Sequence, residues 1–274
     1  LAGGQASPAG TTVAASCEVG EPACDDAAVA LVHDAVARGE WVGVRMGAGD
    51  ASGQMAFDLG DGSSRVLWAS CEAGLARLDG GLADDMLELL LREGRVCAGD
   101  VKALVRELCP IDGSEPARVD APDLDPARLF DVGVAMYLLK SDRDSYDPIE
   151  LLDSELGLGS LPQPTDDVPA EALDAVASRL EREPLAARLA EEGSGKLFDE
   201  VEMPLLPVLM AMERRGLHAD ADILCRQSAE LGDEIALMVE KIHAAAGEDF
   251  NVDSPQQLSH VLFDVLGLPT KGLK

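Results

Sequence analysis

The last third of the chain, residues 196–274, constrains the fold most strongly, because its local signals predict helices with recognisable starts and stops. The first of these helices covers residues 197–215 and ends at Gly216, with two arginines in the last turn, where the helix dipole favours cations. Pro204 and Pro207 each remove a backbone donor, so we expect a kink or a proline-led first turn.

Two further helices follow in the same segment. Asp220 or Asp222 caps a helix that continues to about Ala246, with apolar residues at alternating steps of three and four. Ser254 and Gln257 then form a capping box for a shorter helix, in which a proline takes the first helical position. The segment is therefore predicted to be entirely helical.

The same segment carries a family resemblance. The run LFDEVEMPLLPVLMAMERRGLHAD, followed by GEDFNVDSPQQLSHVLFDVLGLP, resembles the start of the polymerase region of bacterial DNA polymerase I (family A). In that family the motif E-x-P-L-x-P-V-L-x-x-M-E-x-x-G precedes F-N-x-x-S-x-x-Q-L-x-x-x-L-F-x-x-x-G-L-P. The match covers residues 197–269, so the resemblance implies that 196–274 is the N-terminal part of the polymerase domain, at the root of the thumb.

The resemblance also implies a contact with DNA. In the family, the F-N-x-x-S segment runs beside the duplex minor groove, which would place Asn251 and Ser254 near the sugar-phosphate backbone. Such contacts position a duplex without reading its sequence. Capping of the last helix is the competing role for Ser254, and both roles are compatible.

The first two-thirds of the chain predict a different class of fold. Residues 1–24 lack periodicity and are interpreted as a linker or disordered start. Strands gathered early, with helices around and after them, then indicate an α/β or α+β domain over 25–195. The predicted elements are helices at 25–38, 83–92, 100–108, 128–139, 147–156 and 170–192, strands at 41–46, 54–59, 65–69 and 95–97, and a turn at 61–62.

This order of elements resembles the 3′–5′ exonuclease domain that precedes the thumb in DNA polymerase I. The pattern F-D-x-x-x-A-x-Y-L-L at residues 130–139 adds to the resemblance. It implies a ribonuclease H-like α/β fold, with a small central sheet flanked by helices, followed by the all-α thumb base. Asp131, within that pattern, is an isolated acid at a helix start, where capping is its expected role.

Active exonucleases of this type hold two divalent metals between carboxylates, and hydrolysis needs both metals. The position of the D-x-E motif is taken here by Arg45-Met46-Gly47, which offers a cation and a residue without a side chain. In the N-x-x-Y-D motif, Asp100 replaces the asparagine and Leu104 replaces the acid.

The third motif, Y-x-x-x-D, falls at Ala170 to Asp174, where the acid is present and the tyrosine is absent. Isolated acids cannot organise two metals. We therefore expect a degenerate exonuclease-like domain with no catalytic residues and no metal site, which has a structural role.

The composition limits the possible partners. The formal net charge of −29 repels phosphate, so the chain alone is not expected to bind DNA strongly. The six cysteines are scattered, with no C-x-x-C spacing, and indicate reduced thiols in a cytoplasmic protein. No apolar run approaches the roughly 18 residues of a membrane span, so no membrane partner is expected.

The chain is interpreted as an internal piece of a monomeric bacterial DNA-directed DNA polymerase that acts in replication and repair near the nucleoid. The resemblance implies that Mg²⁺, the DNA primer-template and deoxynucleotides bind to the parent protein, chiefly through a palm and fingers outside this chain. Two alternatives stay open: an active metal-dependent 3′–5′ exonuclease with displaced acids, and an acidic protein-interaction module.

Overall fold

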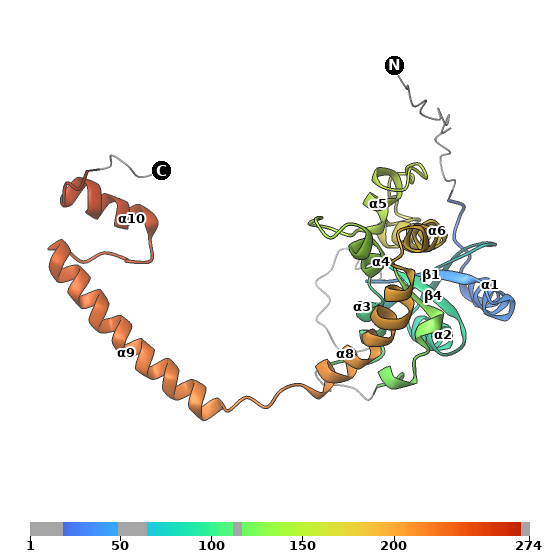
Figure 1. Ribbon diagram of the computed structural model, residues 1–274, viewed down its shortest axis with the longest axis horizontal. Coiled ribbons are helices and arrows are strands. Elements are labelled where there is room, and N and C mark those ends of the chain that lie inside the picture. The colour runs from blue at the N-terminus through green and yellow to red at the C-terminus, as the bar shows by residue number, and fades with distance from the viewer. Residues whose placement is uncertain (1–18, 49–64, 112–116, 270–274) are drawn as a thin grey trace, which may run out of the picture. The chain divides into compact units, whose positions relative to one another are not determined.

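A computed structural model describes residues 19–48, 65–111 and 117–269 of the chain. It divides into two compact units, residues 1–216 (unit 1) and 217–274 (unit 2) (Figure 1). The strand predicted at 54–59 and the turn predicted at 61–62 lie outside the described residues. Unit 1 includes the first helix of the segment that resembles a polymerase region.

Unit 1 is built on a five-stranded mixed sheet with the strand order β3-β2-β1-β4-β5. Strand β2 pairs antiparallel with both β1 and β3, whereas β1, β4 and β5 are parallel. The strands are β1 (Trp41–Ala48), β2 (Arg65–Cys71), β3 (Gly74–Asp79), β4 (Arg95–Ala98) and β5 (Leu129–Asp131).

Helices cover both faces of this sheet, which confirms the predicted α/β class with a small central sheet flanked by helices. The helices of unit 1 are α1 (Asp25–Arg38), α2 (Gly81–Glu93), α3 (Val101–Arg106), α4 (Val132–Leu139), α5 (Pro148–Ser154), α6 (Ala170–Glu191), α7 (Gly195–Leu197) and α8 (Met203–Arg215). A π-helical turn at Phe198–Glu202 joins α7 to α8, and short 3₁₀ turns lie at Ala121–Asp123 and Pro126–Arg128.

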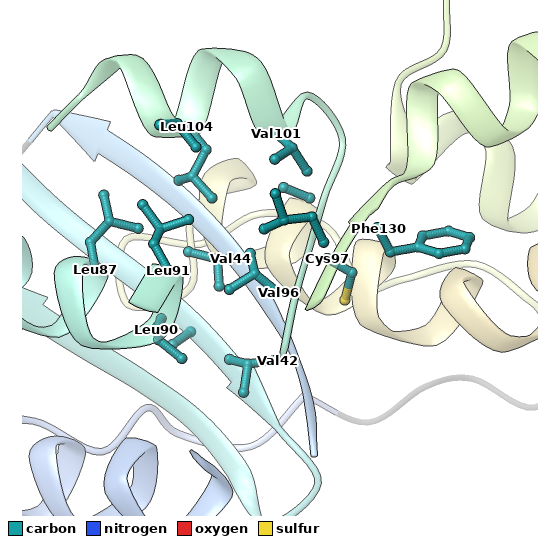
Figure 2. Packing of buried hydrophobic residues seen from close by; sticks show 14 of the residues in the cluster. Val42, Val44, Leu87, Leu90, Leu91, Val96, Cys97, Val101, Leu104 and Phe130 are labelled. Carbon is teal, nitrogen blue, oxygen red and sulfur yellow. The ribbon is translucent and has the colours of Figure 1, made fainter. Parts of the chain in front are cut away.

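Side chains along β1 point alternately to the two faces of the sheet, and the buried residues form two clusters. Val42 and Val44 face the cluster that contains α1, α2 and α3, where Leu87, Leu90 and Leu91 meet the sheet (Figure 2). The other cluster joins β2 to α5 and α6. Helix α6 packs directly on β1, because a Cβ at Gly43 would overlap the carbonyl oxygen of Ala175.

One prediction for unit 1 needs correction, and one strand was not predicted. The helix predicted at 128–139 begins only at Val132, because Leu129–Asp131 pair with β4 as the buried parallel strand β5. A strand of three residues is too short to show a periodicity that distinguishes it from the start of a helix. Strand β3 was not predicted, although it completes the antiparallel edge of the sheet.

Unit 2 consists of helices, as predicted. Helix α9 (Ala221–Ala246) is capped by Asp220, whose Oδ1 accepts a hydrogen bond from the Ile223 N–H at 3.0 Å, and it ends at Gly247 in the left-handed conformation. Helix α10 (Pro255–Ser259) starts at the Ser254 cap and continues as a π-helical turn at His260–Val265. None of the helices in the described part of the chain is both long and apolar enough to cross a membrane.

Candidate functional site

The Arg45 side chain lies against helix α6. Gly43, Arg45 and Gly47 alternate onto the face of β1 that α6 covers, and the close packing at Gly43 brings the helix near the strand. The Nε atom of Arg45 lies 3.4 Å from Oδ2 of Asp174. The first and third motif positions of the sequence hypothesis therefore meet as an ion pair.

Asp174 is 8% exposed, and its other oxygen, Oδ1, accepts a hydrogen bond from the Ser178 hydroxyl at 3.3 Å. Burial raises the pKa of Asp174 to about 6, while the Arg45 guanidinium opposes the rise and the nearby Asp147 carboxyl adds to it. Asp174 is therefore mostly ionised at pH 7, and the guanidinium is its countercharge.

The space beside Gly47 is taken by another residue of α6. A Cβ atom at Gly47 would lie 3.2 Å from Cγ of Glu171. A side chain at position 47 would need Glu171 to move. The second acid expected of a D-x-E motif thus has neither a side chain nor free space in this chain.

Asp100 and Leu104 lie at the start of α3. Asp100 caps the helix, because its Oδ1 accepts a hydrogen bond from the Ala103 N–H at 2.8 Å. Leu104, one turn later, is 5% exposed and points with Val101 into the cluster that contains Leu91 (Figure 2). Its hydrocarbon side chain packs in the hydrophobic core.

Arg45, Asp100 and Leu104 line one small cavity of about 130 Å³. The structure therefore brings together positions that the sequence assigns to separate motifs, with Asp174 joined to them through Arg45. Their assignment to exonuclease motifs stays a prediction.

This donor set does not suit a pair of divalent metals. It offers a guanidinium at Arg45, no side chain at Gly47, a hydrocarbon at Leu104 and a carboxylate at Asp174 that already has a countercharge. Hard divalent cations need several oxygen ligands. Over the described ranges, no group of three or more His, Cys, Asp or Glu residues could hold a metal ion.

Asp131 fulfils its predicted capping role and has a second one. Its Oδ1 accepts a hydrogen bond from the Val134 N–H at 2.9 Å, at the start of α4. Its Oδ2 accepts from the Val101 N–H at 2.8 Å, at the start of α3, and the residue is 4% exposed. Burial raises the pKa of Asp131 to about 7, and these hydrogen bonds oppose the rise.

Sequence reasoning missed Glu181. It is fully buried on α6, and its two carboxyl oxygens have no hydrogen-bond partner among the described residues. Burial raises the pKa of Glu181 to about 9, with further contributions from Asp174 and Asp147, so the carboxyl is protonated at pH 7. The available signal was helical spacing, because Glu181 lies three and seven positions after the buried Ser178 and Asp174.

The predicted DNA-contacting residues belong to unit 2. The Ser254 hydroxyl accepts the Gln257 N–H at 3.5 Å, which is the expected cap at long range. The Gln257 side chain does not return to the Ser254 N–H as a capping box requires, because its Oε1 accepts from the Asn251 N–H at 2.8 Å. Asn251 Oδ1 in turn accepts from the Asp253 N–H at 3.0 Å.

The chain matches no protein-family model. It is 36% identical to DNA polymerase I of Bacillus subtilis over 155 residues, and this match covers 51% of this chain and 18% of that protein. It is 45% identical over 84 residues to DNA polymerase I of Rhizobium leguminosarum, which covers 31% of this chain and 8% of that protein. The chain thus spans less than a fifth of the length of these curated relatives.

A solved structure shares the fold. It is described as the POL domain of Pol1 from M. smegmatis in complex with DNA primer-template and dNTP. The similarity has a TM-score of 0.59 and 21% sequence identity, and covers 92% of this chain and 41% of that one. By sequence, the chain is similar to segments of bacterial DNA polymerase I, and it shares its fold with part of this Pol1 polymerase domain.

Proposed function

We propose that the chain is the part of a bacterial DNA-directed DNA polymerase that joins an inactive 3′–5′ exonuclease-like domain, residues 25–195, to the start of the polymerase domain, residues 196–274. Relatives named DNA polymerase I in several bacteria support this assignment. The whole protein would extend a DNA primer on a template in replication and repair, as a cytoplasmic enzyme associated with the nucleoid. The Mg²⁺ for this chemistry would bind to carboxylates outside this chain.

The topology of unit 1 supports a ribonuclease H-like fold for residues 25–195. Two antiparallel strands, β2 and β3, lie on one side of β1, and the parallel strands β4 and β5 lie on the other. The long helix α6 crosses the sheet face that carries Arg45. A site beside Arg45 would combine residues from β1 and α6, and the start of α3 lines the same small cavity as Arg45. These are the elements of the three exonuclease motifs.

The contact between Arg45 and Asp174 is the observation that carries the inactive assignment. The Arg45 guanidinium occupies the position from which an acid would share a metal with Asp174. Its positive charge would repel an incoming metal cation. Gly47 and Leu104 supply no oxygen in compensation. The domain would therefore act as a scaffold without cleaving a phosphodiester.

The packing of α8 supports a scaffolding role. Its apolar residues Met203, Leu206 and Met210 are buried in the core of unit 1. Near its end, Glu213 pairs with Lys102 at 2.8 Å and with Arg106, both on α3. The helix that opens the polymerase-like segment is thereby fixed to the exonuclease-like domain.

In unit 2, Asn251 and Ser254 are the proposed contacts to the sugar-phosphate backbone of the primer-template. The exposed Asn251 side chain uses its oxygen in a local turn, so its amide nitrogen would face a phosphate. Both residues are uncharged, so they would position a duplex held mainly by other parts of the protein. The whole protein is proposed to act as a monomer without a membrane partner.

Restoring the missing acids tests the motif assignment. The combination Arg45→Asp, Gly47→Glu and Leu104→Asp restores an acid at each of the three motif positions that lack one, with Glu171→Ala added to make space at position 47. We expect the folded variant to bind Mn²⁺ in calorimetry, and the same variant with Asp174→Ala to lose that binding. A folded variant that binds no Mn²⁺ would contradict the assignment.

Primer extension by the whole protein tests the polymerase assignment separately. We expect extension of a primed template with Mg²⁺ and deoxynucleotides, at a rate that Asp174→Ala leaves unchanged. A whole protein that does not extend the primer would refute the polymerase assignment. The result of the Mn²⁺ experiment on the restored site does not depend on this outcome, so the two assignments can fail separately.

A further inference from the structure

A cavity of about 530 Å³ opens on unit 1 between the starts of α3 and α4 and the face of α8. Its walls are mainly apolar and aromatic, and they come from Val134, Tyr137, Tyr146, Leu205, Leu206 and Leu209. Its polar lining comes chiefly from acids. A concave apolar site with a few convergent polar groups is the usual form of a small-molecule site.

The acids give the cavity a negative character. Asp131 uses one lone pair on each oxygen for the backbone N–H groups of α3 and α4, so a second lone pair on each oxygen is left. Asp100 caps α3 through Oδ1, and Glu202 adds a third carboxyl group. Lys102 also lines the cavity, and its ammonium group pairs at 2.8 Å with Glu213, a carboxylate that it shares with Arg106. The three acids outnumber this one cation in the lining.

The aromatic wall presents a surface for a flat group. Tyr137 and Tyr146 pack edge to face, with ring centroids 6.0 Å apart. The Tyr146 hydroxyl donates a hydrogen bond to the Lys140 carbonyl oxygen at 2.8 Å, which fixes that ring. Tyr137 is 53% exposed, and Leu205 and Leu209 are also partly exposed beside it. Exposed apolar side chains grouped around a cavity are typical of a binding surface.

We propose that this cavity binds a small flat organic cation, an amidinium or guanidinium group on an aromatic body. The cation would face the carboxylate of Asp100, where charge-assisted hydrogen bonds are strong, and an oxygen of the buried Asp131 would accept a further hydrogen bond. The aromatic body would stack on Tyr137 and contact Leu205 and Leu209, which adds aromatic stacking and buries apolar surface. The site would act whether or not the whole protein is a polymerase.

Benzamidine is the probe for this proposal, with benzamide and benzoate as its neutral and anionic analogues. Each is titrated into the chain labelled with ¹⁵N, and the amide signals of Gly133, Val134 and Leu209 are followed by NMR. We expect saturable shifts with benzamidine, about tenfold weaker binding of benzamide and no binding of benzoate.

Two substitutions in the wall and two outside it make the test specific. Tyr137→Ala and Asp100→Asn should each weaken benzamidine binding about tenfold, and the asparagine retains the α3 cap. Leu82→Ala and Asp123→Asn change an exposed leucine and an exposed acid that do not line the cavity, and should have no effect. Circular dichroism verifies that each variant is folded.

Equal binding of the three probes would overturn the proposal, because charge would then play no part. Shifts confined to other regions of unit 1, or full affinity in folded Tyr137→Ala and Asp100→Asn, would also overturn it. Absence of saturable benzamidine binding would have the same meaning.

Discussion

Asp131 and Asp174 are both buried carboxyl groups of unit 1, but they are held in different ways. Asp131 accepts hydrogen bonds from two backbone N–H groups, at the starts of α3 and α4. Asp174 is held by two side chains, the Arg45 guanidinium and the Ser178 hydroxyl. An acid bound to backbone groups joins elements of the fold, whereas an acid held by side chains depends on neighbours that substitution can remove. Asp131 is therefore structural, whereas the proposed role of Asp174 as the remnant of a site rests on its pairing with Arg45.

The largest expected effect is the loss of the Asp131 carboxyl group. Asp131→Ala removes a helix cap and leaves the buried N–H groups of Val101 and Val134 without an acceptor, which should lower the free energy of unfolding by about 3 kcal/mol. Asp131→Asn keeps one acceptor and should lose about half as much. Urea unfolding measures both values, and equal stability of the two variants would show that the two hydrogen bonds are not the cause.

Glu181 extends this comparison, since its buried carboxyl group has no hydrogen-bond partner within the described part of the chain. Burial raises the pKa of Glu181 from 4.5 to about 9, so the folded chain binds this proton more tightly than the unfolded chain does. The stability that depends on the protonated carboxyl group is fully present below about pH 4.5 and is lost as the pH rises towards 9. Glu181→Gln removes the need to bind this proton and should stabilise the chain by on the order of 2–3 kcal/mol at pH 7.

Unfolding free energies of the parent chain and Glu181→Gln from pH 5 to 9 test this prediction. The difference between them should grow with pH across that window. Leu180→Ala, a neighbouring change without a titratable group, should give a difference that is independent of pH. A constant difference for Glu181→Gln would contradict the protonated, unpartnered carboxyl group.

A smaller effect is expected from the partner of Asp174. Arg45→Met removes a cation that lowers the pKa of Asp174, so this pKa should rise further above its ordinary value. The pair is partly exposed, so the free energy of unfolding at pH 7 should change by less than about 1 kcal/mol. NMR titration of the Asp174 carboxyl carbon measures the pKa, with Arg38→Met as a control on the distant α1. An unchanged pKa would show that Arg45 does not act on Asp174.

Elements with local start and stop signals could be predicted from the sequence. The helix at 25–38 has the predicted bounds, and the α9 helix is capped by Asp220, one of the two predicted candidates, and stops at Gly247 as predicted. Strand β5 could not be recognised, because its three residues become a strand only by pairing with β4. The π-helical turns have no signature in the residue pattern either.

The same division holds for the candidate site. Its residue types follow from the motifs, and Arg45, Asp100 and Leu104 line one cavity in the folded chain. The pairing of Arg45 with Asp174 could not be predicted, because it depends on the close packing of α6 at Gly43. The second hydrogen bond of Asp131 and the burial of Glu181 likewise depend on tertiary contacts.

Digestion of end-labelled single-stranded DNA by the chain, with Mg²⁺ or Mn²⁺, directly tests whether the exonuclease-like domain is inactive. An active exonuclease in the same buffer serves as the positive control, and Asp174→Ala as the matched variant. We expect no degradation by either form of the chain. Metal-dependent degradation that disappears in Asp174→Ala would show that a working metal site survives beside Arg45, and would contradict the account.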